Sequence, residues 1–313
     1  MPLASKDLLG LKGMNPDDLG LILDTAEPFK RALSHNAKKL ATLKGRTVVT
    51  LFYEPSTRTR TSFEIAAKRL SADTVNIAVA TSSVAKGESF KDTAKTLEAL
   101  GADIVVVRHS MAGAPALYAR SVSSCVINAG DGAHEHPTQG LLDLFTIREK
   151  KGRIRGLKVL IVGDILHSRV AKSNIYGLVA LGAEVMVAGP PTLIPPGIEE
   201  LGVSVTHDVD RAIRDADVVN ILRIQLERQK RGLFPSAREY ARLFGINRER
   251  LAKAKVDVLI MHPGPTNLGV EISSEVAGSL SSVIDEQVTN GVAIRMALLH
   301  LLSGGADGNA IAS

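Results

Sequence analysis

The chain has 313 residues, of which 45% are hydrophobic and 23% are charged, so its composition excludes a disordered or fibrous protein and its length suffices for two domains. A formal charge of +5 and a sequence pI near 9.3 suit an acidic partner, either a nucleic acid or a small anion. The one cysteine, Cys125, excludes an internal disulfide, no apolar run could span a bilayer, and no signal peptide opens the sequence, so we expect a cytoplasmic protein without membrane contact.

The first half of the chain alternates between apolar β-branched runs and amphipathic helical patterns. A helix is predicted from the Asn15-Pro16 cap to about Leu33. Cys125 begins a predicted strand and is expected to be a buried small hydrophobe. Strands are then predicted at 47–52, 74–79, 104–107 and 125–128, and helices at 57–70, 89–100, near 114–120 and over 136–147.

The second half repeats this alternation and ends in a long helix. Continuous apolar strands between helices favour an α/β fold of two domains, each a mainly parallel sheet covered by helices on both faces. We place the two domains at 1–150 and 151–286, with the last helix, 287–303, packing back on the first. Strands are predicted at 158–162, 184–188, 218–222 and 258–261, a helix at 168–181, and a buried helical face at Val288, Val292, Met296 and Leu299.

Polar residues gather where the first predicted strand ends. The segment Leu51–Glu64 passes from an apolar run into Ser56-Thr57-Arg58-Thr59 and then into helical spacing. The free N–H groups and the positive dipole end at a helix N-terminus favour an anion, and guanidinium groups match phosphate oxygens in pairs. We interpret the segment as a phosphate cradle; the alternative is a helix cap beside two solvated arginines.

Two further strand ends carry candidate catalytic side chains. Arg108 directly follows a buried strand, where an arginine with a purely structural role would need a nearby acid. His136 and Gln139 stand at the mouth of the next long helix. His134 and His136 are two residues apart and cannot share a helix face as zinc ligands do, so no metal site is expected. An imidazole aimed at a carbonyl oxygen is the sharper interpretation of His136.

The second half offers a separate set of cations. The segment Gly163–Arg169 occupies the place of a dinucleotide fingerprint but lacks its further glycines, which argues against NAD or FAD. Arg169 near a helix start would suit a carboxylate, and Arg223 and Gln225 share one side of an extended chain. For Arg228 a solvated charged loop is the alternative. Such separate cations fit the positioning of charged substrates better than covalent catalysis, and no organic cofactor is expected.

Five motifs, in order along nearly the whole chain, resemble the aspartate and ornithine carbamoyltransferase family. They are Ser56–Arg60, Lys86-Gly87-Glu88, Gly163–Arg169, Arg223–Arg228 and Met261–Pro265. The first is shared by the whole family, and the other four resemble its aspartate-using branch. The resemblance implies a transferase that moves the carbamoyl group of carbamoyl phosphate to the α-amino group of L-aspartate, giving N-carbamoyl-L-aspartate and phosphate, an early step of pyrimidine biosynthesis.

The resemblance also implies that 1–150 is a carbamoyl-phosphate-binding domain and 151–286 an aspartate-binding domain, and it implies a role for each candidate residue. Catalysis would rest on Arg58, Thr59, Lys86, Arg108 and His136. The carbamoyl phosphate site would comprise Ser56, Thr57, Arg58, Thr59, Ser82, Lys86, Arg108, His136 and Gln139. The aspartate site would comprise Lys86, Arg169, Arg223, Gln225, Gly264 and Pro265, with a cis bond before Pro265. Glu54 would latch the domains shut by pairing with Arg169 and Arg228.

The same resemblance implies an assembly. In the family, the loop that holds Ser82 and Lys86 reaches the neighbouring subunit's site, so a homotrimer with shared active sites is expected, with regulatory chains or a dihydroorotase as optional partners. One departure from the family pattern is Leu268, where relatives often carry an arginine. Another is Pro55, which stiffens the entry to the cradle.

The sequence also allows two other functions. One is a carbamoyltransferase with another amine acceptor, although Lys86 and Arg223 favour the two carboxylates of aspartate over the side-chain cation of ornithine. The other is a nucleic-acid-binding module that uses the basic region 223–255. There Phe234, Tyr240 and Phe244 interleave with cations, but no nucleic-acid motif accompanies them, and helical aromatic residues are usually core.

Overall fold

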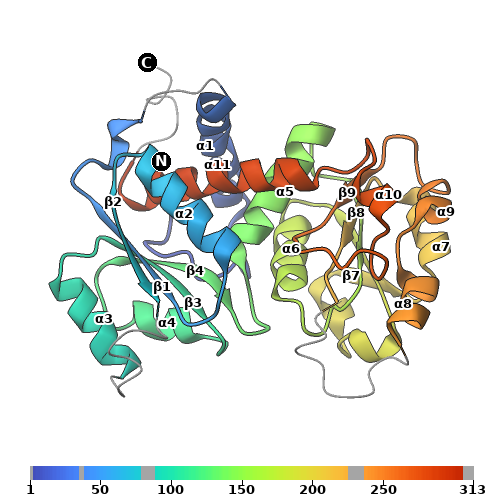
Figure 1. The fold of residues 1–313 in the computed structure, drawn as a ribbon, viewed down its shortest axis with the longest axis horizontal. Helices are drawn as coiled ribbons and strands as arrows, with labels where there is room; N and C mark the ends of the chain where they lie inside the picture. The colour runs from blue at the N-terminus through green and yellow to red at the C-terminus, as the bar shows by residue number, and fades with distance from the viewer. Residues whose placement is uncertain (1–2, 35–38, 79–88, 225–235, 306–313) are drawn as a thin grey trace. The chain divides into compact units, whose positions relative to one another are not determined.

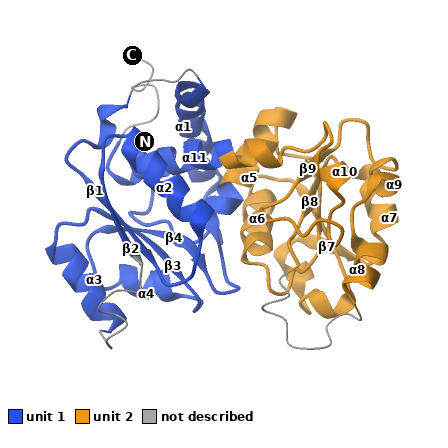
Figure 2. Cartoon of the chain, viewed as in Figure 1, with its two compact units in different colours: residues 1–141, 289–313 blue, residues 142–288 orange. Residues whose placement is uncertain are grey.

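The computed structural model describes residues 3–34, 39–78, 89–224 and 236–305, and the chain divides into two compact units (Figures 1 and 2). Unit 1 comprises residues 1–141 and 289–313, and unit 2 comprises residues 142–288. The two boundaries fall inside the helices α5 (Pro137–Lys151) and α11 (Ile284–Leu302). The chain therefore passes from one unit to the other within helices.

Unit 1 is built on a four-stranded parallel sheet in the order β2-β1-β3-β4. Most residues of β1, β3 and β4 are buried, which explains their continuous apolar sequences and confirms the predicted parallel sheet covered by helices. Its strands are β1 (Thr47–Phe52), β2 (Asp73–Ala78), β3 (Ile104–His109) and β4 (Cys125–Asp131), and its helices include α1 (Pro16–Ser34), α2 (Thr57–Arg69), α3 (Phe90–Ala99) and α4 (Ala114–Ala119).

The segment before α1 lies along β4, the outer strand of this sheet. The backbone N–H of Leu8 donates to the carbonyl of Val126 at 2.9 Å, and the N–H of Asn128 donates to the carbonyl of Leu8 at 2.8 Å. The carboxylate of Asp7 accepts the N–H of Val126 at 2.8 Å. The strand-like pairing of Leu8 and the side chain of Asp7 therefore hold this segment at the edge of the sheet.

The end of α11 packs within unit 1, as predicted. The ring of His300 lies edge-on to Phe29 of α1, with centroids 5.8 Å apart, and the half-buried Cys125 donates its thiol to the carbonyl of Leu302 at 3.1 Å. Cys125 is thus less buried than expected. The prediction that Val288 belongs to a buried face is wrong, since its side chain is 58% exposed. From Ala293 onward the helix is buried on most sides. The buried positions there therefore do not define one face that continues to the start of the helix, where Val288 lies.

Arg295 connects the same helix to α2. Its guanidinium donates to the hydroxyl of Ser62 at 2.9 Å and lies 5.1 Å from the centre of the Phe63 ring. Burial lowers the pKa of Arg295 to about 10. This arginine therefore holds α11 against the helix that begins at the predicted phosphate cradle.

Unit 2 contains a five-stranded parallel sheet in the order β7-β6-β5-β8-β9. The strand β7 is not in the sequence-based prediction because it has only four residues and lies at the sheet edge. The strands are β5 (Lys158–Val162), β6 (Glu184–Ala188), β7 (Val203–Thr206), β8 (Val218–Ile221) and β9 (Leu259–Met261), and the helices include α6 (Arg169–Ala180), α7 (Val209–Ala212), α8 (Ala237–Phe244), α9 (Arg248–Leu251) and α10 (Ser274–Ala277). In the described part of the chain, no helix has the length and apolar character needed to cross a membrane.

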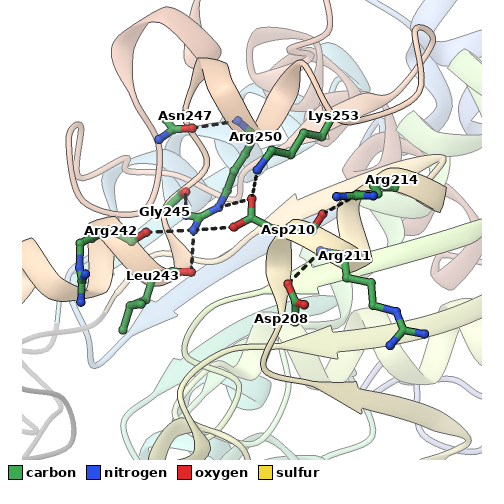
Figure 3. A network of polar contacts seen from close by, with 10 residues as sticks. All are labelled: Asp208, Asp210, Arg211, Arg214, Arg242, Leu243, Gly245, Asn247, Arg250 and Lys253. Atoms are coloured by element: carbon green, nitrogen blue, oxygen red, sulfur yellow. Dashed lines mark hydrogen bonds and ion pairs between the residues drawn. The ribbon is translucent and has the colours of Figure 1, made fainter.

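The buried Arg250 anchors the end of α8 (Figure 3). Its guanidinium donates to the carbonyls of Arg242 and Leu243, both at 2.9 Å, and to that of Gly245. It also pairs with Asp210 of α7, with Nε 3.3 Å from Oδ1. The last carbonyls of a helix lack partners within the helix, so a cation placed there stabilises the helix end. Hydrogen bonds from Lys253 and Arg250 in turn lower the pKa of Asp210.

Candidate functional site

The carboxyl ends of β1 and β3 bring two of the predicted site elements together. In the sheet order β2-β1-β3-β4, the direction of winding reverses between β1 and β3, and ligands of open parallel sheets bind at such a switch point. Phe52 pairs with Arg108 across these strands, and the N–H of Tyr53 donates to the carbonyl of Arg108 at 2.9 Å. The segment 56–59 therefore starts α2 beside the end of the strand that carries Arg108.

The first turn of α2 has the features expected of an anion site. Ser56 is the N-cap residue with extended backbone, at φ −160°, but its side chain makes no capping hydrogen bond. By contrast, the N-cap side chains of α3, α6, α7, α8, α9 and α10 each accept a backbone N–H. The first turn of α2 also holds no acid, while Thr57 and Arg58 are exposed and Thr59 is buried. These facts speak against the capping alternative and leave the positive helix end available to an anion.

Arg108 is held from two sides. Its Nε lies 3.5 Å from the carboxylate of Glu54, and its Nη1 donates to the carbonyl of Ala129 at 3.4 Å. The acid that a structural arginine would need is therefore present, so this position is compatible with either role. Glu54 makes this contact within unit 1. Its predicted pairing with Arg169 and Arg228 stays a prediction, and Arg228 lies outside the described residues.

An aromatic cluster that the sequence analysis missed lies next to this pair. The ring of His109 is 4.6 Å from Tyr53 and 5.4 Å from Phe90, measured between centroids. The N–H of Met111 donates to His109 Nδ1 at 2.9 Å, so the neutral ring carries its proton on Nε2. Burial lowers the pKa of His109, and the charges of Glu54 and Asp131 oppose this shift. Phe90 is the first residue of α3, so the cluster fixes the start of this helix beside the end of β3.

Two buried acids, Asp131 and Glu135, fix the turn that precedes His136. Asp131 accepts the amide of Asn128 at 2.9 Å and the N–H of Gly113 at 2.7 Å. Glu135 accepts the N–H groups of Leu11 and Lys12, at 2.7 and 3.2 Å. His136 itself is 5% exposed and directly precedes α5. Its Nδ1 lies 3.5 Å from the hydroxyl of Thr138, and Gln139 is half-buried in the same first turn.

Unit 2 has its own switch point, between β5 and β8, and Arg169 follows the end of β5. Gly163 has φ +135°, and a Cβ there would lie 3.0 Å from the Cβ of Leu222, so only glycine lets these two strand ends approach. The buried Asp164 then accepts the N–H of His167 at 3.1 Å. Ser168 caps α6, and Arg169 is its first residue, 5% exposed.

The other predicted residues of unit 2 lie at the ends of β8 and β9. Arg223 is half-buried directly beyond β8. The peptide bond between Gly264 and Pro265 is cis, as predicted. Leu268 is 56% exposed, so this expected departure from the family pattern lies at the surface of unit 2. The predicted residues that lie outside the described part of the chain are Ser82, Lys86, Gln225 and Arg228.

Two of the three aromatic residues that suggested nucleic-acid binding are buried in the structure. Tyr240 and Phe244 of α8 are 1% and 8% exposed and pack in the hydrophobic core of unit 2 with Ile221 and Ile260. Buried rings cannot stack on bases. Phe234 lies outside the described residues.

Comparisons with known proteins agree with this geometry. Residues 6–149 match the family model "Aspartate/ornithine carbamoyltransferase, carbamoyl-P binding domain", and residues 155–302 match the corresponding "Asp/Orn binding domain". An aspartate carbamoyltransferase catalytic subunit from Pelotomaculum thermopropionicum is 66% identical over 97% of this chain and 99% of its own length. One from Moorella thermoacetica is 62% identical over 98% and 100%.

Solved structures of both branches of the family have the same fold. An aspartate transcarbamoylase from Trypanosoma cruzi, in complex with carbamoyl phosphate and aspartate, is 30% identical with a TM-score of 0.87, and the match covers 96% of this chain and 98% of that one. An ornithine carbamoyltransferase from Pyrococcus furiosus is 31% identical with the same TM-score, and the match covers 98% and 99%. On the two family models and these relatives, the chain belongs to the aspartate/ornithine carbamoyltransferase family.

Proposed function

We propose that this protein is an aspartate carbamoyltransferase, which transfers the carbamoyl group of carbamoyl phosphate to the α-amino group of L-aspartate. The observation that carries the proposal is that arginines lie near the switch point of each sheet, the one between β1 and β3 and the one between β5 and β8. An uncapped helix start with Arg58 and a neighbouring Arg108 lies at the one in unit 1, and Arg169 and Arg223 follow strand ends at the one in unit 2. The first set suits a phosphate, and the second suits the two carboxylates of aspartate.

The identity of the acceptor is supported by residues rather than by the fold. Solved aspartate and ornithine enzymes match this chain with equal TM-scores, so the fold does not choose between them. Ornithine carries a side-chain ammonium, which an arginine-lined site repels. The relatives with identities of 60–66% over nearly the full chain are named as aspartate enzymes.

The proposed reaction proceeds by direct attack. The α-amino nitrogen of aspartate forms a bond to the carbonyl carbon of carbamoyl phosphate, and the bond from this carbon to the phosphate oxygen then breaks. Thr59, Arg108 and His136 stabilise the negative charge that develops on the carbonyl oxygen, an effect worth about 3 kcal/mol for each lost donor. Arg58 stabilises the departing phosphate, which also accepts the proton of the amine. Gln139 holds the carbamoyl amide.

The direct test is a comparison of two acceptors. The purified protein is incubated with carbamoyl phosphate and either L-aspartate or L-ornithine, and the carbamoylated amino acid and the released phosphate are both measured. We expect N-carbamoyl-L-aspartate in equal amount to the phosphate, and no citrulline. Formation of citrulline without N-carbamoyl-L-aspartate would show that the acceptor assignment is wrong.

We further propose a cytoplasmic homotrimer that serves pyrimidine biosynthesis and in which each active site takes Ser82 and Lys86 from a neighbouring chain. This proposal is supported only by membership of the family. If sites are shared, a mixture of inactive Lys86→Ala chains and inactive Arg108→Ala chains regains part of the wild-type activity, because some sites then contain neither substitution. No recovery in trimers verified to contain both variants would contradict shared sites.

A further inference from the structure

We propose that Glu271 is a positioning residue for aspartate, acting through a buried hydrogen-bond network in unit 2. The network comprises Asp143, Asn174, Gln287, His262 and Glu271, and we call it the inner network. Each of these side chains is at most 3% exposed. The inference rests on the proposed function, since it concerns how the second substrate is held.

His262 is the centre of the inner network. Its ring Nδ1 accepts the backbone N–H of Gly264 at 2.8 Å, which leaves the proton of the neutral ring on Nε2. Nε2 lies 3.2 Å from Oε1 of Glu271 and therefore donates to that carboxylate. The imidazole thus fixes the backbone directly before Pro265, which is one of the proposed aspartate-binding positions.

Glu271 extends the inner network to the end of β8. Its Oε1 also accepts the backbone N–H of Asn267, whose side-chain amide donates to the carbonyl of Ile224 at 3.1 Å. Ile224 directly follows Arg223 in the chain. The other carboxylate oxygen of Glu271 is buried and has no hydrogen-bond partner among the described residues. A carboxylate in that condition costs stability, which favours a role in geometry over a role in folding.

The other end of the inner network reaches α6. Gln287 accepts the N–H of His262 at 3.0 Å and donates its amide to Asp143 at 2.7 Å. The second oxygen of Asp143 accepts the amide of Asn174 at 2.7 Å. Asn174 belongs to α6, whose first residue is Arg169. One continuous set of hydrogen bonds therefore contacts the three elements that carry Arg169, Arg223 and Gly264.

This arrangement predicts a selective effect. Every residue of the inner network lies in unit 2, whereas the proposed carbamoyl phosphate residues that the structure describes lie in unit 1. Contacts that hold a substrate equally in the ground state and in the transition state set KM and leave kcat unchanged. Loosening the network should therefore weaken the use of aspartate and leave the binding of carbamoyl phosphate unchanged.

The test is the variant Glu271→Gln, which keeps the shape but removes the charge that holds His262 and Asn267. We expect the KM for aspartate to rise about tenfold or more, with kcat at saturating aspartate and the Kd for carbamoyl phosphate both within about twofold of wild type. The variant Asn267→Ala removes only the side-chain amide that reaches Ile224, from a half-buried position, and should raise the KM for aspartate in the same way. If Glu271→Gln does not fold, the KM for aspartate of Asn267→Ala tests the inference in its place.

The matched control is Asp217→Asn. Asp217 precedes β8, at the amino end of the strand, where it accepts the N–H of Lys158 at 2.8 Å and the ammonium of Lys255 at 2.6 Å. The same loss of charge there should lower Tm without changing the KM for aspartate. A wild-type KM in folded Glu271→Gln or Asn267→Ala, or an equal rise in the control, overturns the inference. A wild-type protein that does not carbamoylate aspartate overturns the proposed function instead.

Discussion

The variant His136→Ala should lower kcat by about 100-fold and leave the KM for aspartate within a few-fold of wild type. The buried imidazole is proposed to stabilise charge that exists only in the transition state, so its loss affects turnover more than substrate affinity. The measurement is initial rate against aspartate concentration at saturating carbamoyl phosphate.

The chain offers a control for this variant two residues earlier. The side chain of His134 is 46% exposed and contacts Asp131 rather than the end of β1 or β3. His134→Ala should keep kcat within a few-fold of wild type. If the two variants lose turnover equally, the effect belongs to the turn and not to the imidazole of His136.

The variant Arg223→Ala should reduce kcat/KM for aspartate by about 10- to 100-fold, since a hydrogen bond to a charged group is worth about 1.5–3 kcal/mol. The Kd for carbamoyl phosphate should stay at the wild-type value, because Arg223 belongs to unit 2. Rates at varied aspartate concentration and calorimetric titration with carbamoyl phosphate together measure both quantities.

Arg242→Ala is the matched control, because this arginine belongs to the same unit and its side chain is 74% exposed. It should leave aspartate kinetics unchanged. Wild-type aspartate kinetics in Arg223→Ala would remove this residue from the proposed site.

Local sequence signals were sufficient for most of the fold. Continuous β-branched runs predicted the long central strands, and the start of α5 followed from Pro137. The start of α2 was predictable for the same reason, since an apolar strand stops directly before Ser56. The short β7 and the exposed Val288 were not, because a four-residue edge strand has little periodicity and a helix can change its buried face along its length.

The residues that support the site were not predictable in this way. Glu135 accepts the backbone N–H of Leu11 from 124 positions away in the chain, and Gln287 accepts the backbone N–H of His262 across 25 positions. An acid in a sequence looks the same whether it faces water or the interior. Only the folded chain shows that Glu135 and Glu271 are both buried.

The segment that lies along β4 has a further consequence, for solubility. The outer strand of a sheet presents unpaired N–H and C=O groups, and a long apolar edge of this kind recruits strands from other molecules. Six of the seven residues of β4 are buried, so an uncovered β4 would be such an edge. The backbone of Leu8 and the carboxylate of Asp7 pair with the N–H groups of Val126 and Asn128 and with the carbonyl of Val126. Loss of these few residues before α1 is therefore expected to expose part of this edge and to lower the solubility of the protein.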